Sequence, residues 1–306
     1  MRLVELQLLN GVSGGVVFAL GLIFGSFLNV CIYRMPRGMS VVRPRSACPK
    51  CGKQIAAYDN VPVLSWLWLR GRCRHCRARI TPRYMIVELL LGLLFLACFA
   101  QFGLQAETLK ACTFSFLLLG LIFTDAETHI LPDKLTLPGF GLGLVWSLLI
   151  SVPGPLGFFY GRGASPAPLL SLADAAIGAA VGAGFIWGTA AIYLRLRGAE
   201  GMGMGDVKLM AMVGAFLGAP LTLFVLATAS VLGGVYGAMI VVNIFRKRLS
   251  RYRRVPDRSR PAARAWQSAS LSLRFHEMPF GVLLGSMALF AQFAGQRILT
   301  WYLGLL

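Results

Sequence analysis

Long intervals without a charged residue constrain this chain more than any other feature. A helix needs about 20 apolar residues to cross roughly 30 Å of hydrocarbon. The chain has 306 residues, of which 57% are hydrophobic and 14% charged, whereas soluble domains have about 45–50% and 25%. We therefore expect an all-α polytopic membrane protein. The intervals that predict single spans are 6–33, 84–106 (interrupted only by Glu88), 135–161, 175–194 and 278–296.

The first interval is a span rather than a cleaved signal peptide, because it is too long for a signal-peptide core and no A-x-A site follows it. Between Lys110 and Asp125 lie only 14 uncharged residues, about 21 Å of helix. This segment spans the membrane only if Asp125 is drawn into it. The 37 residues from Leu209 to Phe245 are long enough for two helices, with a break at Gly218-Ala219-Pro220. The first helix is again short, so Asp206 should also be drawn in, and the total becomes about eight spans.

The basic residues predict which side each loop faces. Residues 34–83 contain 12 Lys and Arg, and residues 246–274 contain 10, so both loops should be cytoplasmic and both chain ends outside. Asp125 and Asp206 then lie at the same, cytoplasmic, end of their helices. The excess of 30 basic over 12 acidic residues indicates membrane lipids as partners and no nucleic acid.

This topology divides the chain into three parts. They are a first transmembrane helix (1–33), a cytoplasmic four-cysteine loop (34–83), and a membrane-embedded core (84–306). The core includes the basic loop 246–274, expected to be lipid-facing or disordered.

Four of the seven cysteines form two CxxC pairs separated by 21 residues. This is close to the spacing of structural zinc sites, in which four thiolates fill the tetrahedral shell and leave no position for a substrate. In a reducing compartment, redox-active or incidental cysteines are the less favoured alternative. The predicted Zn²⁺ ligands are Cys48, Cys51, Cys73 and Cys76.

Two carboxylates predict catalytic chemistry, because an ionisable group inside a membrane is expensive to keep there. Asp206 follows the glycine-rich run Gly201–Gly205. If Asp125 and Asp206 approach each other, they share one proton, and one can act as base for a water while the other acts as acid. That is the chemistry of an aspartyl protease. We expect Asp133 to be the N-cap of the fourth span, and Glu88 to lie at the inner headgroup level near Arg83.

The ordered motifs resemble the type IV prepilin peptidase family over nearly the whole chain. They are Gly25-Ser26-Phe27-Leu28-Asn29-Val30 with Arg34 and Pro36, the two CxxC pairs, Ile80-Thr81-Pro82-Arg83-Tyr84 with Glu88, Asp125 with Pro132-Asp133-Lys134-Leu135-Thr136-Leu137-Pro138, Gly203-Met204-Gly205-Asp206 with Lys208, and Pro279-Phe280-Gly281.

The resemblance implies that Asp125 and Asp206 are the catalytic pair of a bacterial inner-membrane endopeptidase. Members of the family remove the basic leader of type IV prepilins or type II secretion pseudopilins at the cytoplasmic face. Many then methylate the new N-terminus with S-adenosylmethionine. For the methyl donor, no nucleotide-binding glycine pattern is present, and the resemblance favours the zinc loop and its flanks. Polar groups near that region are Asn29, Arg34, Arg72, Arg83 and Glu88.

One departure from the family is Glu127, where an Asp is usual; the carboxylate is kept, so we expect a minor effect. Two other functions stay open. The same aspartates could relay protons in a transporter, although no two-fold repeat is evident, or the chain could be a non-catalytic assembly factor.

Overall fold

The computed structural model describes residues 2–156, 168–198, 203–252, 266–268 and 279–304. All the secondary-structure elements of the described residues are helices, as the predicted all-α fold requires. Its main helices are α1 (Arg2–Arg34), α3 (Arg83–Phe102), α4 (Ala106–Thr128), α5 (Asp133–Leu149), α7 (Pro168–Arg197), α8 (Met204–Tyr252), α10 (Phe280–Phe290) and α11 (Gln296–Leu303), with the π-helix η2 (Ala291–Gly295) joining α10 to α11. Two short helices lie between α1 and α3, namely the 3₁₀ helix η1 (Ala57–Asn60) and α2 (Leu64–Trp68).

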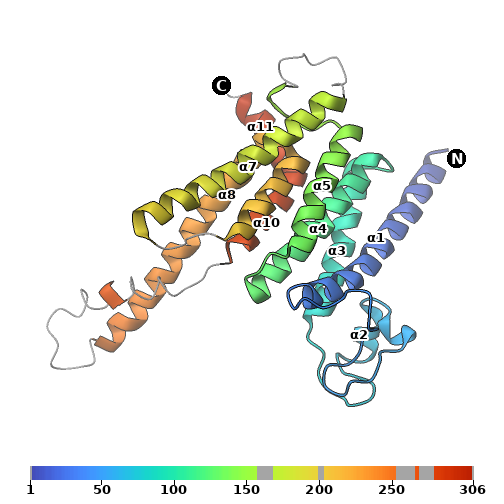
Figure 1. The fold of residues 1–306 in the computed structure, drawn as a ribbon. Coiled ribbons are helices and arrows are strands. Elements are labelled where there is room, and N and C mark those ends of the chain that lie inside the picture. Colours follow the sequence, from blue (N-terminus) through green and yellow to red (C-terminus); the bar gives the residue numbers. More distant parts are fainter. Residues whose placement is uncertain (1, 157–167, 199–202, 253–265, 269–278, 305–306) are drawn as a thin grey trace.

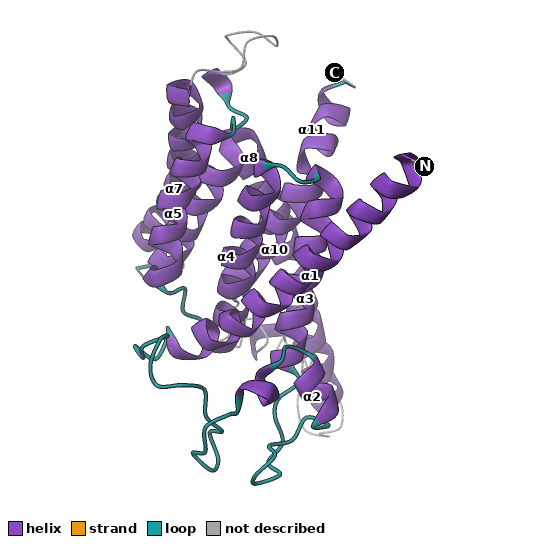
Figure 2. Ribbon diagram, turned by 90° about the vertical axis from the view of Figure 1, so that its right-hand side faces the viewer, coloured by secondary structure: helices purple, strands orange, loops and turns teal. Residues whose placement is uncertain are grey.

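The helices form one bundle, with the loop that carries α2 attached at one end (Figure 1). Figure 2 shows that the start of α1 and the end of α11 both lie at the opposite end of the bundle from this loop.

Small residues let α1 and α3 pack closely. A Cβ on Gly21 would lie 2.7 Å from the Cα of Gly92, and a Cβ on Gly25 would lie 2.7 Å from the Cα of Glu88. Without these glycines the two backbones could not approach each other, as in other membrane helix pairs that associate through small residues. The motif beginning at Gly25 therefore holds the end of α1 against the start of α3.

Helix α4 belongs to both hydrophobic cores of the bundle. Its residues Ala111, Cys112 and Leu119 pack with buried residues of α1 and α3. Others, including Phe114 and Leu118, pack with buried residues of α5, α7, α8 and α10. The helix therefore separates the N-terminal pair, α1 and α3, from the C-terminal group.

Helix α8 is broken at Gly218, whose φ of 77° is not helical. Gly182 of α7 lies against both Met210, before the break, and Thr222, after it. Residues eight positions before and four positions after Gly218 thus contact the same point of α7. The two arms of α8 therefore run side by side from the break, at the position that the Gly-Ala-Pro sequence predicted.

Several predicted boundaries were wrong. The fourth span ends at Leu149 rather than 161, and the fifth begins at Pro168 rather than 175. Asp174, the charged residue just before the predicted span 175–194, is buried within α7 and accepts a hydrogen bond from the Leu156 amide at 3.0 Å. Residues 246–252 continue α8; the rest of the predicted basic loop lies outside the described residues except for 266–268.

Among the described helices, six are long and apolar enough to cross a membrane. Helix α5 has 17 residues, and α8 counts as one of the six although it is broken at Gly218. Eight spans stay a prediction. Helix α4 includes both Lys110 and Asp125 and reaches 23 residues, which is how the short third interval becomes long enough to span.

Candidate active site

Asp125 lies near the end of α4 and is 6% exposed. The helix continues to Thr128. The next residue, His129, adopts a left-handed conformation (φ 52°) and donates its backbone N–H to the Asp125 carbonyl at 2.9 Å. Polar Thr124 does not interrupt the helix because its hydroxyl donates to the Gly120 carbonyl at 2.6 Å. The carboxylate is thereby held on a rigid helix at the end of the bundle near the cysteine loop.

Asp206 lies in the first turn of α8 and is 9% exposed. Leu131, in the turn after α4, contacts the surroundings of both acids. A Cβ on Gly205 would lie 3.0 Å from the Leu131 Cβ, and a Cβ on Gly281 would lie 3.2 Å from the Leu131 Cδ1 and 2.8 Å from Asp125 Oδ2. The two carboxylates interact electrostatically. The structure therefore brings the two predicted aspartates together in one buried site.

The beginning of α10 covers the Asp125 carboxylate. The backbone N–H of Val282 donates to Asp125 Oδ2 at 3.0 Å, and the Gly281 amide interacts with the same group. Sequence reasoning found the Pro279-Phe280-Gly281 motif but assigned it no role. A main-chain donor carries no side-chain signal by which it could have been found.

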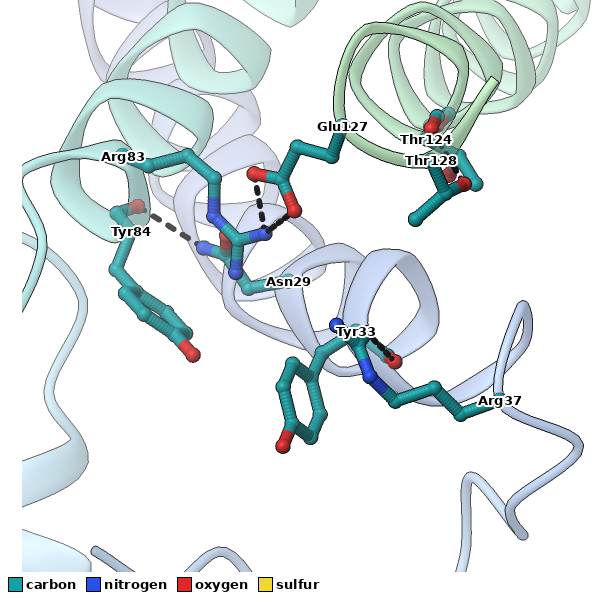
Figure 3. Close-up of polar contacts among 9 residues, drawn as sticks. Asn29, Tyr33, Arg37, Arg83, Tyr84, Thr124, Glu127 and Thr128 are labelled. Atoms are coloured by element: carbon teal, nitrogen blue, oxygen red, sulfur yellow. Dashed lines mark hydrogen bonds and ion pairs between the residues drawn. The ribbon is translucent and has the colours of Figure 1, made fainter. Parts of the chain in front are cut away.

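Two ion pairs flank the acids, each starting two residues after an aspartate. Glu127 accepts hydrogen bonds from Arg83 at 2.6 and 2.7 Å (Figure 3). Lys208 donates to Asp133 Oδ1 at 2.6 Å. The prediction that Asp133 is an N-cap was wrong, since Pro132 occupies that position and no side chain caps the helix. Asp133 instead links the start of α5 to α8.

Glu88 has a different role from the one predicted. It is 8% exposed and buried where α3 packs against α1, and Arg83 pairs with Glu127 rather than with Glu88. Its carboxylate accepts the backbone N–H of Val63 at 2.7 Å. Glu88 therefore anchors the cysteine loop to α3.

The four predicted cysteines form a candidate metal centre. Their sulfur atoms all lie within 4.8 Å of one another, and Cys48 and Cys76 are 3.8 Å apart. A tetrahedron with zinc–sulfur bonds of about 2.3 Å has edges of about 3.8 Å, so the donor set fits Zn²⁺.

Both cysteine pairs have the same backbone turn. The Cys48 amide donates to the Lys53 carbonyl and the Cys73 amide to the Ala78 carbonyl, at 2.9 and 2.8 Å. Positive φ angles at Gly52 (70°) and Arg77 (57°) complete the turns. The loop is thus folded so that both pairs present their thiols to one point.

The second pair is also tied to the rest of the loop. The Arg74 guanidinium donates to both carboxylate oxygens of Asp59 in η1, with Nε at 2.8 and 3.1 Å. This hydrogen bonding lowers the pKa of the Asp59 carboxyl. The ion pair is therefore formed at neutral pH and joins the second cysteine turn to η1.

A cavity of about 510 Å³ lies between the cysteine loop and the ends of α1, α3 and α4. Its lining residues include Asn29, Trp66, Arg83, Glu88 and Glu127. The Asn29 amide donates to the Tyr84 carbonyl at 2.9 Å (Figure 3), but its Oδ1 and the Nε of Arg83 are buried without a partner among the described residues. Of the polar groups noted in the sequence, Arg34 also lines this cavity whereas Arg72 does not.

Comparisons with known proteins agree with these features. A family model described as the bacterial peptidase A24 N-terminal domain matches residues 19–102, and one described as the type IV leader peptidase family matches residues 111–238. No solved structure matches this chain.

Three relatives are named prepilin leader peptidase/N-methyltransferase. That of Myxococcus xanthus is 43% identical over 74% of this chain, but the aligned part covers only 62% of the relative. The Aeromonas hydrophila relative is 35% identical over 94% of this chain and 93% of its own length, and the Neisseria gonorrhoeae relative is 34% identical over 80% and 87%. These matches do not support the transporter alternative. Similarity across nearly the full length of both chains shows that this protein belongs to the type IV leader peptidase family.

Proposed function

We propose that this protein is a membrane-embedded aspartyl endopeptidase that removes the basic leader of type IV prepilins or type II secretion pseudopilins at the cytoplasmic face of the bacterial inner membrane. The observation that carries the proposal is the meeting of Asp125 and Asp206 in one buried site. The names of the relatives support the substrate class, and the basic loop 34–83 supports a cytoplasmic location for the site.

The pair suits peptide hydrolysis because two carboxylates at close range hold one proton between them. The ionised group takes a proton from water, and the protonated group supplies one to the scissile peptide. A leader that extends from the membrane edge reaches both acids past the glycine-rich approach to Asp206. Asp125 and Asp206 are accordingly the proposed catalytic residues.

The second proposed activity is methylation of the new N-terminal residue, with S-adenosylmethionine as donor. When bound, this cofactor supplies a methyl group activated by a sulfonium. The cavity beside the cysteine loop has room for it, and the unpartnered Asn29 Oδ1 and Arg83 Nε need hydrogen-bonding groups that a polar ligand would provide. Asn29, Arg83 and Glu88 are the proposed donor-site residues.

The four cysteines are proposed to hold one structural Zn²⁺. With four thiolate ligands the metal has no open position for a substrate, so it stabilises the loop that forms one wall of the cavity.

One assay tests both activities. Purified protein is incubated with S-adenosylmethionine and a peptide carrying a basic leader before a Gly-Phe junction. Asp125→Asn and Asp206→Asn should each reduce cleavage by about 10³-fold or more, as for other residues that act as a catalytic unit. Both variants should still methylate a peptide that already begins with the Phe. Asn29→Ala, in contrast, should lose methylation and keep cleavage. Near-native cleavage by either Asn variant would remove that aspartate from catalysis.

A further inference from the structure

The Pro279-Phe280-Gly281 motif has no role in the proposed function so far, yet it starts the helix that covers one of the two acids. Helix α10 begins at Phe280, and Pro279 precedes it with φ −70°. The first amides of a helix have no partner within the helix and are available to an acceptor. In α10 the acceptor is the Asp125 carboxylate.

The Val282 N–H is shared between the Pro279 carbonyl at 3.2 Å and Asp125 Oδ2 at 3.0 Å, so the contact with the acid is the shorter one. Gly281 makes this approach possible, because a Cβ at this position would lie 2.8 Å from Asp125 Oδ2 and 3.0 Å from its Cγ. Any larger residue would push the carboxylate away from the amides. The glycine of the motif is therefore required by the contact rather than by a turn.

Asp206 has no equivalent contact. Among the described residues, none donates a hydrogen bond to its carboxylate, although Asp206 lies in the first turn of α8. Both acids are thus close to a helix N-terminus, and the dipoles act on both. What distinguishes Asp125 is the hydrogen bond that it accepts from the Val282 N–H. A hydrogen bond donated to a carboxylate favours its ionised form.

We infer that the α10 N-terminus assigns the two catalytic roles: Asp125 is the ionised base and Asp206 carries the shared proton. This assignment rests on the proposed function. In the first step Asp125 takes a proton from water, the water oxygen bonds to the scissile carbon, and the carbonyl oxygen takes the proton of Asp206.

In the second step the C–N bond breaks. The leaving nitrogen takes the proton from Asp125, and a hydroxyl proton of the intermediate returns to Asp206. Both acids recover their starting states, and the net reaction consumes one water and one peptide bond.

The charged and titratable groups that interact with Asp125 are few in the described structure. Asp206 faces it from α8, and His129 at the end of α4 also interacts with it. Within the described residues, α10 contributes only its backbone amides. Because His129 interacts electrostatically with Asp125, the test is run in a His129→Asn background, which removes this interaction; Asn is also suited to the left-handed position that His129 occupies.

The test is the pH dependence of kcat/KM for peptide cleavage, whose acid limb reports protonation of the base. Val282→Pro removes the N–H, and proline is tolerated in a first helical turn. We expect the acid limb to move to higher pH by about one unit, since a hydrogen bond to a charged group is worth about a tenfold change in protonation. Val282→Ala keeps the N–H and should keep the limb at its original pH, whatever its absolute rate.

An amide-to-ester replacement at position 282 removes the same N–H while keeping the valine side chain, and should give the same shift if the proline variant does not fold. An unmoved acid limb in a folded, active proline or ester variant would overturn the assignment. So would a shift confined to the basic limb, since that would make Asp125 the acid. Neither result affects the proposed peptidase, which fails only if Asp125→Asn or Asp206→Asn still cleaves.

Discussion

At the scale of single residues, the two ion pairs beside the acids differ in how much water reaches them. The Arg83 and Glu127 side chains are 13% and 35% exposed, whereas those of Lys208 and Asp133 are 32% and 55% exposed. Exposed ion pairs contribute little to stability, but removing one partner of a buried pair leaves an unpaired charge. The arginine is also stacked on the Tyr84 ring, 4.5 Å from its centroid.

Glu127→Gln should therefore lower the free energy of unfolding more than Asp133→Asn. We expect about 1–2 kcal/mol for the first and less than about 1 kcal/mol for the second. Thermal unfolding of the two purified variants in the same detergent measures the difference. An equal or larger loss in Asp133→Asn would mean that exposure does not decide what these pairs contribute.

The sequence identified the two acids but not which charged residues beside them form ion pairs with each other. A charge inside a membrane segment stands out by itself, which is why Asp125 and Asp206 could be selected. Arg83 and Glu127 are 44 residues apart, and Asp133 and Lys208 are 75 apart. Which charges meet depends on how the helices pack, and no local pattern encodes that.

At the scale of elements, the break in α8 determines where its first arm can lie. Gly218 has a left-handed φ, and a Cβ on it would collide with the Pro153 carbonyl oxygen. Gly218 is thus required for two reasons. It adopts the left-handed conformation without strain, and its lack of a side chain allows the close approach to the segment after α5. Pro220 lies two residues further on, inside α8. Gly218 and Pro220 together made this break predictable from the sequence.

Gly218→Ala should destabilise the protein by about 2 kcal/mol or more, because a left-handed conformation alone costs roughly 1–2 kcal/mol and the collision adds to it. Gly234→Ala, in the second arm of α8, is the matched control. A Cβ there meets nothing within 4 Å, and alanine favours a helix by up to about 1 kcal/mol. Thermal unfolding should separate the two variants clearly; similar stabilities would show that the strain at Gly218 is relieved by a small backbone shift.

Helix ends were predicted less well than the helices themselves, because charged residues were taken as boundaries. Lys110, Asp125 and Asp174 all lie within helices. Asp125 and Asp174 can do so because a backbone amide, of Val282 and Leu156 respectively, donates a hydrogen bond to each carboxylate. The sequence shows the charge but not the partner that makes its burial acceptable.

At the scale of the whole molecule, the cysteine loop and the helix bundle are stabilised by different means. The loop has few buried apolar residues, and its four thiols meet at one point. The bundle is packed through two hydrophobic clusters. If the thiols hold the proposed Zn²⁺, its loss should therefore loosen the loop and leave the bundle folded.

Trypsin digestion of membrane vesicles measures this and also the side on which the loop lies. Chelation of zinc, or Cys51→Ser, should accelerate cleavage at exposed arginines of the loop such as Arg70, Arg72 and Arg77, and only in inverted vesicles, whose cytoplasmic face is outward. Helical circular dichroism should hardly change. Cleavage confined to right-side-out vesicles would reverse the proposed topology. A cleavage rate that does not change on chelation would argue against a structural metal.

Helix α4 has a consequence for the order of events on one substrate molecule. Asp125 and Glu127 are two residues apart, which places them about 200° apart around the helix axis. One faces the start of α10, and the other lines the cavity by the cysteine loop. Under the proposed function, a newly exposed N-terminus must therefore pass around a helix about 10 Å thick before it is methylated. The two proposed active sites then lie on opposite sides of α4. The cleaved, unmethylated pilin is an intermediate that moves from one site to the other.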